Sequence, residues 1–173
     1  NNIFQYPYGN TEVISTATKS CPANYVGSVP YPYKVPANTY GSYLSTQDAT
    51  RKAKADVDAN GQAWADSLGF CRAYYSFSTC CGFSSVYSNF NQENGTAYFQ
   101  FVLTYGSTFP TGTFMSVGSI SGVLYLPAAD RTVTVNEGGR VWQVQIKTTG
   151  GIYVKLVSGT APSSINLSGS YTL

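Results

Sequence analysis

The sequence of 173 residues contains no histidine. This absence excludes catalytic sites of the Ser-His-Asp and Cys-His types and metal sites built on imidazole ligands. The sequence also lacks a P-loop, a dinucleotide-binding fingerprint, a G-x-S-x-G motif and the acid spacing of an EF-hand. A Ca²⁺ site made of backbone carbonyls and one or two Asp side chains stays open. Metal ligation by the cysteines is the alternative to disulfides, although no C-x₂-C pair faces a second pair. We expect no catalytic residues, no metal site and no cofactor, and therefore a protein that is not an enzyme.

Eight acidic residues are candidates for paired-carboxylate chemistry. Four of them fall on one expected helix: Asp48, Asp56, Asp58 and Asp66. Asp56 and Asp58 point to different faces of that helix, so a solvated helix face is the simpler interpretation. Asp130 stands next to Arg131 before an expected strand, and we interpret this pair as a turn salt bridge.

Charge is scarce, since charged residues make up 10% of the chain against about 25% in ordinary soluble domains. The net charge is +2, and the only basic cluster, at 51–54, has acidic neighbours on the same expected helix. Nucleic acids and anionic membranes are therefore not expected as partners. No apolar stretch reaches the ~18 residues of a membrane span, so membrane insertion is not expected either.

Tyrosine is abundant, with 15 copies in the chain. A surface hydrated by hydroxyls and amides suits extracellular adhesins, fibres and sugar-facing proteins. A tyrosine-rich β-sheet is an equally simple interpretation, because Tyr favours strands. The sequence starts at Asn1 without an initiating Met, which we interpret as removal of a signal peptide or as trimming.

The four cysteines are Cys21, Cys71, Cys80 and Cys81. In a chain of low charge they indicate disulfides formed in an oxidising compartment, so we expect a secreted, cell-surface or virion protein. A Cys21–Cys71 bridge would close a loop of about 50 residues and stabilise the fold by roughly 4 kcal/mol. A disulfide between the adjacent Cys80 and Cys81 is strained and rare. Pairing of Cys21 or Cys71 with one of these two, or a bridge from them to another subunit, stays open.

The chain divides into three expected parts: an extended N-terminal arm at 1–17, a helix-containing unit at 18–72 and an antiparallel β domain at 73–173. In the arm, aromatic residues alternate with Gln, Pro and Gly as on one face of a strand. The arm is either the first strand of the domain's own sheet or a strand donated to a neighbouring subunit. Its candidate assembly residues are Ile3, Phe4, Tyr6, Tyr8 and Val13.

One helix is expected after Ser45, which forms a capping-box-like start with Asp48. Its apolar stripe comprises Ala49, Ala53, Val57, Trp64 and Leu68. Gly69 is the expected helix stop, just before Cys71.

Period-two alternation dominates from Arg72 onward and predicts short strands. The segment 97–105 places Ala97, Phe99, Phe101, Leu103 and Tyr105 on one face. Turns at 136–139 and 150–151 separate further alternating segments, which indicates hairpins. The expected fold is mainly β with one α-helix: an antiparallel β-sandwich or barrel, preceded by a small helix-containing, disulfide-bracketed unit and the extended N-terminal arm.

Exposed aromatic rings are the remaining binding chemistry, because they stack on sugar rings and also form protein interfaces. Tyr74 and Tyr75 are adjacent, so one of them must face away from the core if they lie on a strand. The candidate ligand-contact residues are Tyr74, Tyr75 and Tyr153, and surface positions are also expected for Tyr87, Tyr98 and Tyr125. Cross-strand Tyr pairs on a solvated sheet face are the simpler interpretation for each of them.

The stretch from Cys21 to Cys71 carries a pattern of its own. It contains a Val-Pro-Ala turn at 35–37, a Ser-x-x-Asp-Ala helix start at 45–49, the sequence ANGQAWA at 59–65 and a closing Gly-x-Cys at 69–71. This pattern resembles a domain of unknown function that recurs in large secreted and surface proteins of Bacteroidetes-type bacteria. The resemblance implies an extracellular location and modular use in adhesins or appendages, and it implies no catalytic residues.

The segment 119–173 is similar to terminal β-domains of phage tail fibres and surface appendages, on the sequences LPAADRTVTV, VWQVQIKTTGGIYVKL and SGTAPSSINLSGSY. This similarity implies a tip or shaft domain of a virion or cell surface. We therefore expect a structural or adhesive subunit of a surface fibre, a pilus-like filament or an adhesin, that assembles with copies of itself by exchange of residues 1–17. The alternative is a tip domain that binds glycans or a surface receptor.

Overall fold

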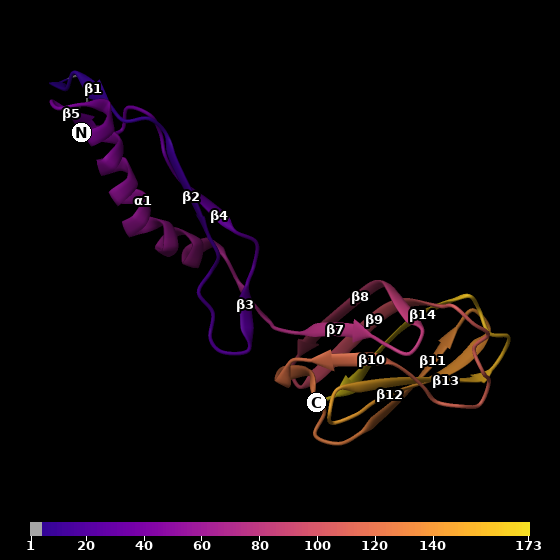
Figure 1. Ribbon diagram of the computed structural model, residues 1–173. Helices are drawn as coiled ribbons and strands as arrows, with labels where there is room; N and C mark the ends of the chain where they lie inside the picture. Colours follow the sequence, from indigo (N-terminus) through magenta and orange to yellow (C-terminus); the bar gives the residue numbers. More distant parts are fainter. Residues whose placement is uncertain (1–4) are drawn as a thin grey trace. The chain divides into compact units, whose positions relative to one another are not determined.

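A computed structural model describes residues 5–173 of the protein. Two compact units follow one another along the chain: the first ends at Arg72 and the second spans Ala73–Leu173. Over the described residues, the fold is mainly β with one α-helix, and its sheets are antiparallel (Figure 1). The fold class expected from the sequence is confirmed.

The helix of the first unit, α1 (Thr46–Leu68), begins where the sequence predicts it. The Ser45 hydroxyl accepts a hydrogen bond from the backbone N–H of Asp48 at 3.1 Å, which satisfies one donor that a helix start leaves open. The helix ends at Gly69, whose backbone is extended rather than left-handed. A Cβ atom there would lie 2.8 Å from the Cβ of Lys19, so Gly69 is needed for the close approach of a neighbouring segment.

The buried face of α1 is a row of small residues at every fourth position: Ala49, Ala53, Val57, Gly61 and Ala65. The prediction that Trp64 and Leu68 belong to this face is wrong, because their side chains are 43% and 47% exposed. A strict four-residue row runs obliquely along a helix, and it leaves positions 64 and 68 on the flank. From there the Trp64 ring packs edge-on against the Tyr33 ring, with ring centres 6.1 Å apart. Its indole N–H donates a hydrogen bond to the Pro32 carbonyl oxygen at 3.0 Å.

Three two-stranded ladders accompany the helix. They pair β1 (Tyr8–Gly9) with β5 (Gly41–Ser42), β2 (Val13–Ala17) with β4 (Tyr31–Val35), and β3 (Tyr25–Gly27) with β6 (Cys71–Ala73). The helix packs on β2 and β4. Val35, Ala53 and Val57 form the small core of this packing, and small helix residues allow the close approach that it needs.

The N-terminal segment is not a free arm over its described part. Tyr8 lies opposite Ser42, and Val13 lies opposite Val35. These residues therefore pair within the first unit, and they add no strand to the sheets of the β domain. The expected residues Ile3 and Phe4 lie outside the described part of the chain.

Asn10 fixes this segment between β1 and β2. Its side chain is 2% exposed, its amide N–H donates to the Pro36 carbonyl oxygen at 2.9 Å, and its amide oxygen accepts the Tyr40 N–H at 2.7 Å. Both polar atoms of a buried amide are thus satisfied, which makes the segment an integral part of the unit.

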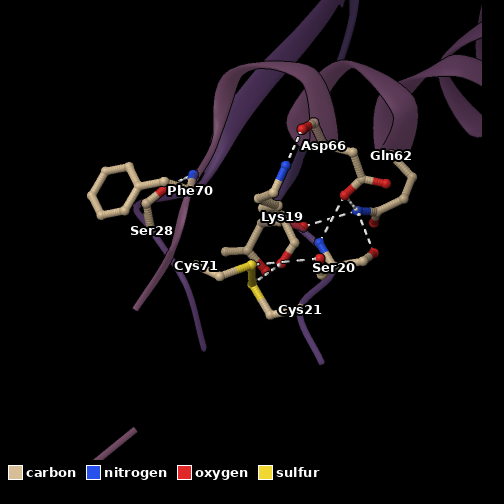
Figure 2. The surroundings of a disulfide bond; sticks show 9 residues. Lys19, Ser20, Cys21, Ser28, Gln62, Asp66, Phe70 and Cys71 are labelled. Carbon is tan, nitrogen blue, oxygen red and sulfur yellow. Dashed lines mark hydrogen bonds between the residues drawn. A yellow bond between two sulfur atoms is a disulfide. The ribbon is translucent and has the colours of Figure 1, made fainter. Parts of the chain in front are cut away.

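The Cys21–Cys71 disulfide ties the segment before β3 to the strand that follows α1 (Figure 2). Its Cα atoms lie 5.8 Å apart, within the usual range for a disulfide. Beside it, the Asp66 carboxylate accepts the Ser20 N–H at 2.7 Å and the Gln62 amide at 2.9 Å. The disulfide therefore lies in a cluster of polar contacts that holds the C-terminal end of the helix.

The other disulfide joins Cys80 to Cys81. The alternative pairings, which would have tied the helix unit to the sheet, are wrong. The rare bridge between adjacent residues is formed at a turn, where Cys81 has the left-handed backbone angle φ 62° and Gly82 has φ 90°.

Asp56 is a tether of the first unit rather than part of a solvated helix face. Its carboxylate accepts hydrogen bonds from the Tyr40 hydroxyl at 2.8 Å, the Tyr33 hydroxyl at 3.2 Å and the Asn60 side-chain amide at 2.6 Å. Two of these donors come from the strand side of the unit. The carboxylate therefore links α1 to the chain that it packs against.

Asp48 has a similar role at the start of the helix. Its carboxylate accepts the Ser42 hydroxyl at 2.7 Å and pairs with Arg51 at 2.7 Å. Asp58, by contrast, pairs with Lys54 of its own helix at 3.0 Å, and both side chains are exposed. The prediction of a solvated acidic face is thus right for Asp58 and wrong for Asp48, Asp56 and Asp66, since donors from neighbouring segments reach those three.

The second unit consists of two facing sheets, arranged as in a sandwich, that do not close into a barrel over residues 73–173. The five-stranded sheet has the order β11 (Arg131–Glu137), β12 (Arg140–Ile146), β13 (Gly151–Ser158), β10 (Met115–Ser121) and β7 (Ser76–Thr79). The three-stranded sheet has the order β14 (Ser164–Thr172), β9 (Thr96–Tyr105) and β8 (Phe83–Glu93). A short 3-10 helix, η2 (Val123–Tyr125), follows β10.

The core between the sheets follows the period-two alternation read from the sequence. Its largest fully buried side chains include Trp142, Phe101, Leu103, Ile146, Ile152, Leu156, Ile165 and Leu167. The expected hairpins β11–β12 and β12–β13 are formed. The alternation therefore sets both the sheet pairing and the buried face of this unit.

The expected salt bridge between Asp130 and Arg131 is wrong. The Asp130 carboxylate accepts hydrogen bonds from the Lys147 ammonium at 2.9 Å and from the Thr148 backbone N–H at 3.0 Å. Arg131 instead donates to the Thr172 carbonyl oxygen at 3.0 Å. Adjacent residues at the start of a strand point to opposite sides, so each finds a partner on a different element.

A chain that starts at Thr18 tests the role of the N-terminal segment. We expect the first unit of this truncated chain to unfold, because it loses β1, β2 and the buried amide of Asn10. The measurement is the helical circular dichroism signal, with the intact chain as control. A truncated chain that keeps its helix and loses only self-association would support a donated strand instead.

Acid should destabilise the first unit. Hydrogen bonds from Asn60 and Tyr40 hold the pKa of Asp56 below its usual range, and those from Arg51 and Ser42 lower the pKa of Asp48 to about 2. A carboxyl group with a lowered folded-state pKa stabilises the fold above its unfolded pKa and loses this contribution as the pH falls through the folded value.

We therefore expect the free energy of unfolding to decrease from about pH 5 to about pH 2, followed by the helical circular dichroism signal in denaturant. The Asp56→Asn variant should be less stable at pH 7 and show a smaller decrease toward acid. Asp58→Asn is the control and should follow the parent profile. Superimposable profiles for the parent and Asp56→Asn would contradict the role of Asp56.

Candidate ligand-binding face

The outer face of the three-stranded sheet gathers polar side chains in rows across its strands. Successive residues of a strand point to opposite faces. On β9, Phe99, Phe101 and Leu103 enter the core, so Tyr98 and Gln100 point outward. Three consecutive rows run from β8 through β9 to β14: Tyr87–Val102–Asn166, Asn89–Gln100–Ser168 and Asn91–Tyr98–Ser170. These nine residues are called the β8–β9–β14 face below.

The β8–β9–β14 face carries no charged side chain. The nearest acid is Glu93 in the next row, opposite Thr96. The nine residues comprise four amides, two serine hydroxyls, two tyrosines and one valine. Side-chain amides both donate and accept hydrogen bonds, and so do hydroxyls. The face therefore offers both hydrogen-bond donors and hydrogen-bond acceptors and carries no net charge.

A shallow groove of about 520 Å³ lies on this face. Six face residues line it: Asn89, Asn91, Tyr98, Gln100, Ser168 and Ser170. The Asn91 amide oxygen accepts the Gln92 N–H at 2.9 Å. Over residues 5–173, the side chains of Asn89, Gln100 and Ser168 have no hydrogen-bond partner within the protein, so their polar groups are available to solvent or a ligand.

Two aromatic rings stand on the face, since Tyr87 and Tyr98 are each 47% exposed. Tyr98 belongs to the row that lines the groove, and Tyr87 lies on β8 opposite Val102, four residues along β9. A strand rises about 3.4 Å per residue, so the two positions are roughly 14 Å apart along the sheet. That separation suits an extended ligand better than a single small molecule.

The aromatic residues predicted to contact a ligand differ in their exposure. Tyr74 is 48% exposed, whereas the Tyr75 ring packs against the rings of Phe90 and Tyr125 in the core, at 5.4 and 5.3 Å. One of the two adjacent tyrosines therefore faces outward and the other inward. Tyr153 is half-buried on the outer side of β13, with the Lys147 ammonium 5.9 Å from its ring centre. None of the three belongs to the β8–β9–β14 face.

Tyr125 is a further correction, because it is 2% exposed. It lies in the 3-10 helix η2, where the period-two phase of the strands no longer applies. Its backbone carbonyl oxygen accepts the Tyr171 hydroxyl at 2.8 Å. Desolvation by burial raises the pKa of Tyr171, which keeps that hydroxyl protonated as a donor.

The candidate assembly residues are divided between the surface and the core of the first unit. The Tyr6 ring packs against the Tyr43 ring in a tilted arrangement, with ring centres 4.8 Å apart, and Tyr8 is 43% exposed. Val13 packs against the small helix–strand core. The structure therefore assigns Val13 to stability, and it leaves Tyr6 and Tyr8 beside an aromatic surface.

Of this face, the sequence predicts surface positions for Tyr87 and Tyr98, and its polar members were not predicted. A local signal does exist: Asn89 and Asn91 flank the buried Phe90, and Gln100 separates Phe99 from Phe101. Their assembly into rows depends on the pairing of β8, β9 and β14, which local sequence does not encode.

Over the described residues 5–173, no group of three or more Cys, Asp or Glu side chains is arranged to hold a metal ion. The helices in the same part of the chain include none that combines the length and the apolar character needed to cross a bilayer.

Comparison with known protein families finds a match for the first unit. Residues 8–72 match a family of unknown function, DUF5977. The resemblance of the Cys21–Cys71 stretch to a domain of unknown function is thereby confirmed. The DUF5977 segment contains the helix, its strands and the Cys21–Cys71 disulfide, and it ends before the β8–β9–β14 face begins. No curated protein and no solved structure matches the chain.

Proposed function

We propose that this chain is an extracellular, non-enzymatic binding module and that the β8–β9–β14 face binds neutral glycans. The observation that carries the proposal is the uncharged groove, lined by amides, hydroxyls and the Tyr98 ring. Two disulfides support an oxidising compartment. The module belongs on a secreted or surface structure such as an adhesin.

The chemistry of the face matches that of a neutral sugar. Each sugar hydroxyl both donates and accepts hydrogen bonds, as amide side chains do. The apolar face of a pyranose ring can stack on an exposed tyrosine, which buries apolar area on both partners. Absence of charge removes attraction for anionic polysaccharides, and so the face favours neutral chains.

A second proposal is self-association of the module within a surface fibre. It is favoured by large apolar side chains beside the β1–β5 ladder: Tyr8, Tyr43 and Leu44 are 43%, 67% and 78% exposed. Clustered exposed side chains of this kind are typical of protein interfaces. Exchange of residues 1–17 is a weaker mechanism for it, because β1 and β2 already have partners within the unit.

Glycan binding is tested with the intact chain on an array of neutral and anionic polysaccharides. We expect binding to neutral chains only. Tyr98→Ala should weaken it about tenfold, because a stacked ring contributes about 1.4 kcal/mol. Gln100→Ala should also weaken it, through loss of hydrogen bonds to the sugar. Tyr74→Ala is the matched control, since Tyr74 has nearly the same exposure as Tyr98, 48% against 47%, and lies off the face.

Equal loss of binding in Tyr74→Ala and Tyr98→Ala would contradict the assignment of the face. Silence of the parent chain toward every neutral polysaccharide on the array would contradict the proposed ligand class.

Self-association is tested by light scattering over a range of protein concentrations. We expect the parent chain to form oligomers, and a double variant with Tyr43→Ser and Leu44→Ser to remain monomeric, because it removes the exposed apolar pair. Val123→Ser is the control, since Val123 is 59% exposed in the second unit. A parent chain that is monomeric at every concentration would refute this proposal.

A further inference from the structure

The Cys80–Cys81 disulfide differs from the other one in what it can do for stability. It joins neighbouring residues, whereas Cys21–Cys71 spans a sequence separation of 50. A disulfide stabilises a fold mainly by closing a loop in the unfolded chain. A bridge between neighbours closes no such loop, so chain entropy does not explain why this one is formed.

The two disulfides also differ in access. Cys80 and Cys81 are both exposed, whereas Cys21 and Cys71 are half-buried. Exchange with an external thiol requires a thiolate to reach one sulfur in line with the bond, so its rate depends on access. The bridge in the β7–β8 turn is therefore the one that an external thiol reaches first.

The backbone of the turn is held by hydrogen bonds that do not depend on the bridge. Cys81 has φ 62°, a left-handed conformation that a residue with a Cβ atom adopts at a cost. The flanking residues are held in place, since the Cys80 N–H donates to the Val117 carbonyl oxygen at 3.1 Å and the Phe83 N–H donates to the Cys80 carbonyl oxygen at 3.0 Å. These two backbone hydrogen bonds do not involve the sulfurs, so the turn keeps its anchors when the bridge opens.

Ser116 makes the two sulfurs unequal. Its hydroxyl oxygen lies 3.4 Å from the Cys80 sulfur. A hydroxyl at this position can donate a hydrogen bond to a thiolate that forms on Cys80, and a stabilised thiolate is the better leaving group in disulfide exchange. Cys81 is therefore the sulfur that is attacked, and Cys80 is the one that leaves.

We propose that Cys80–Cys81 is a thiol-exchange site, opened by external dithiols while Cys21–Cys71 stays intact. A thiolate of the dithiol attacks the Cys81 sulfur and forms a mixed disulfide there. The Cys80–Cys81 bond breaks, and its electron pair goes to the Cys80 sulfur, which the Ser116 hydroxyl stabilises. The second thiol of the dithiol then displaces Cys81 as a thiolate. The dithiol leaves as a cyclic disulfide, and both cysteines end as thiols after protonation.

The reaction is measured on the intact, folded chain with dithiothreitol as the dithiol. Samples are quenched with iodoacetamide at increasing times, and peptide mass spectrometry reports which cysteines carry the label. We expect Cys80 and Cys81 to be labelled about tenfold faster than Cys21 and Cys71. Equal rates, faster labelling of Cys21 and Cys71, or labelling of Cys80 and Cys81 before dithiothreitol is added would each overturn the proposal.

The role of Ser116 is tested with Ser116→Ala. Loss of its hydroxyl should slow reduction on the order of threefold, because the Cys80 thiolate becomes a poorer leaving group. Ser119→Ala is the matched control, since Ser119 lies on the same strand and its hydroxyl oxygen lies 3.4 Å from the Ser78 hydroxyl instead of a sulfur. Equal rates for the two variants would overturn the assignment of Cys80 as the leaving sulfur. Both readouts are independent of glycan binding.

Discussion

The alternation of strand β9 is the constraint on which the second unit depends. Its residues Phe99, Phe101 and Leu103 are at most 3% exposed, whereas Tyr98 is 47% exposed. Because β9 is the central strand of its sheet, its neighbours β8 and β14 must match its register to place their own apolar residues inward. The same match aligns their polar residues in rows outside. A shift by one residue would exchange the two faces, so core packing and the arrangement of the β8–β9–β14 face are one property of the sheet.

The first unit is stabilised in another way, because its core is small. Among its described residues, the buried apolar cluster consists of Val35, Ala53 and Val57. Hydrogen bonds of buried or half-buried polar side chains add to the stability of this small core. Asp56 accepts hydrogen bonds from two tyrosine hydroxyls, and both polar atoms of the buried Asn10 amide are hydrogen-bonded. The Cys21–Cys71 disulfide limits the unfolded chain further. A unit held by polar tethers depends on their protonation, whereas packing of an apolar core does not.

Local patterns in the sequence were sufficient to predict the helix and the main strands, but they were insufficient to predict the β8–β9–β14 face. The Ser45 cap, the burial of Phe99 and Phe101, and the hairpins after residue 131 all follow from short periodicities and turn residues. Trp64 was misplaced because the buried row of α1 advances by four residues at each step and lies oblique to the predicted stripe. Tyr125 was misplaced because a 3-10 turn interrupts the strand phase. The candidate face depends on three strands far apart in sequence, and only their register shows that Asn89, Gln100 and Ser168 are neighbours.

The lack of charge that suits a neutral ligand has a consequence for strand β8. This strand forms an edge of its sheet, and edge strands usually carry charges that prevent pairing with other chains. Within β8 the only charged residue is Glu93, at its end. A β-bulge between Ser85 and Tyr87 interrupts its pairing with β9, and a bulge twists an edge out of the flat geometry that pairing requires. The bulge thus provides a geometric protection where charges would interfere with the proposed ligand.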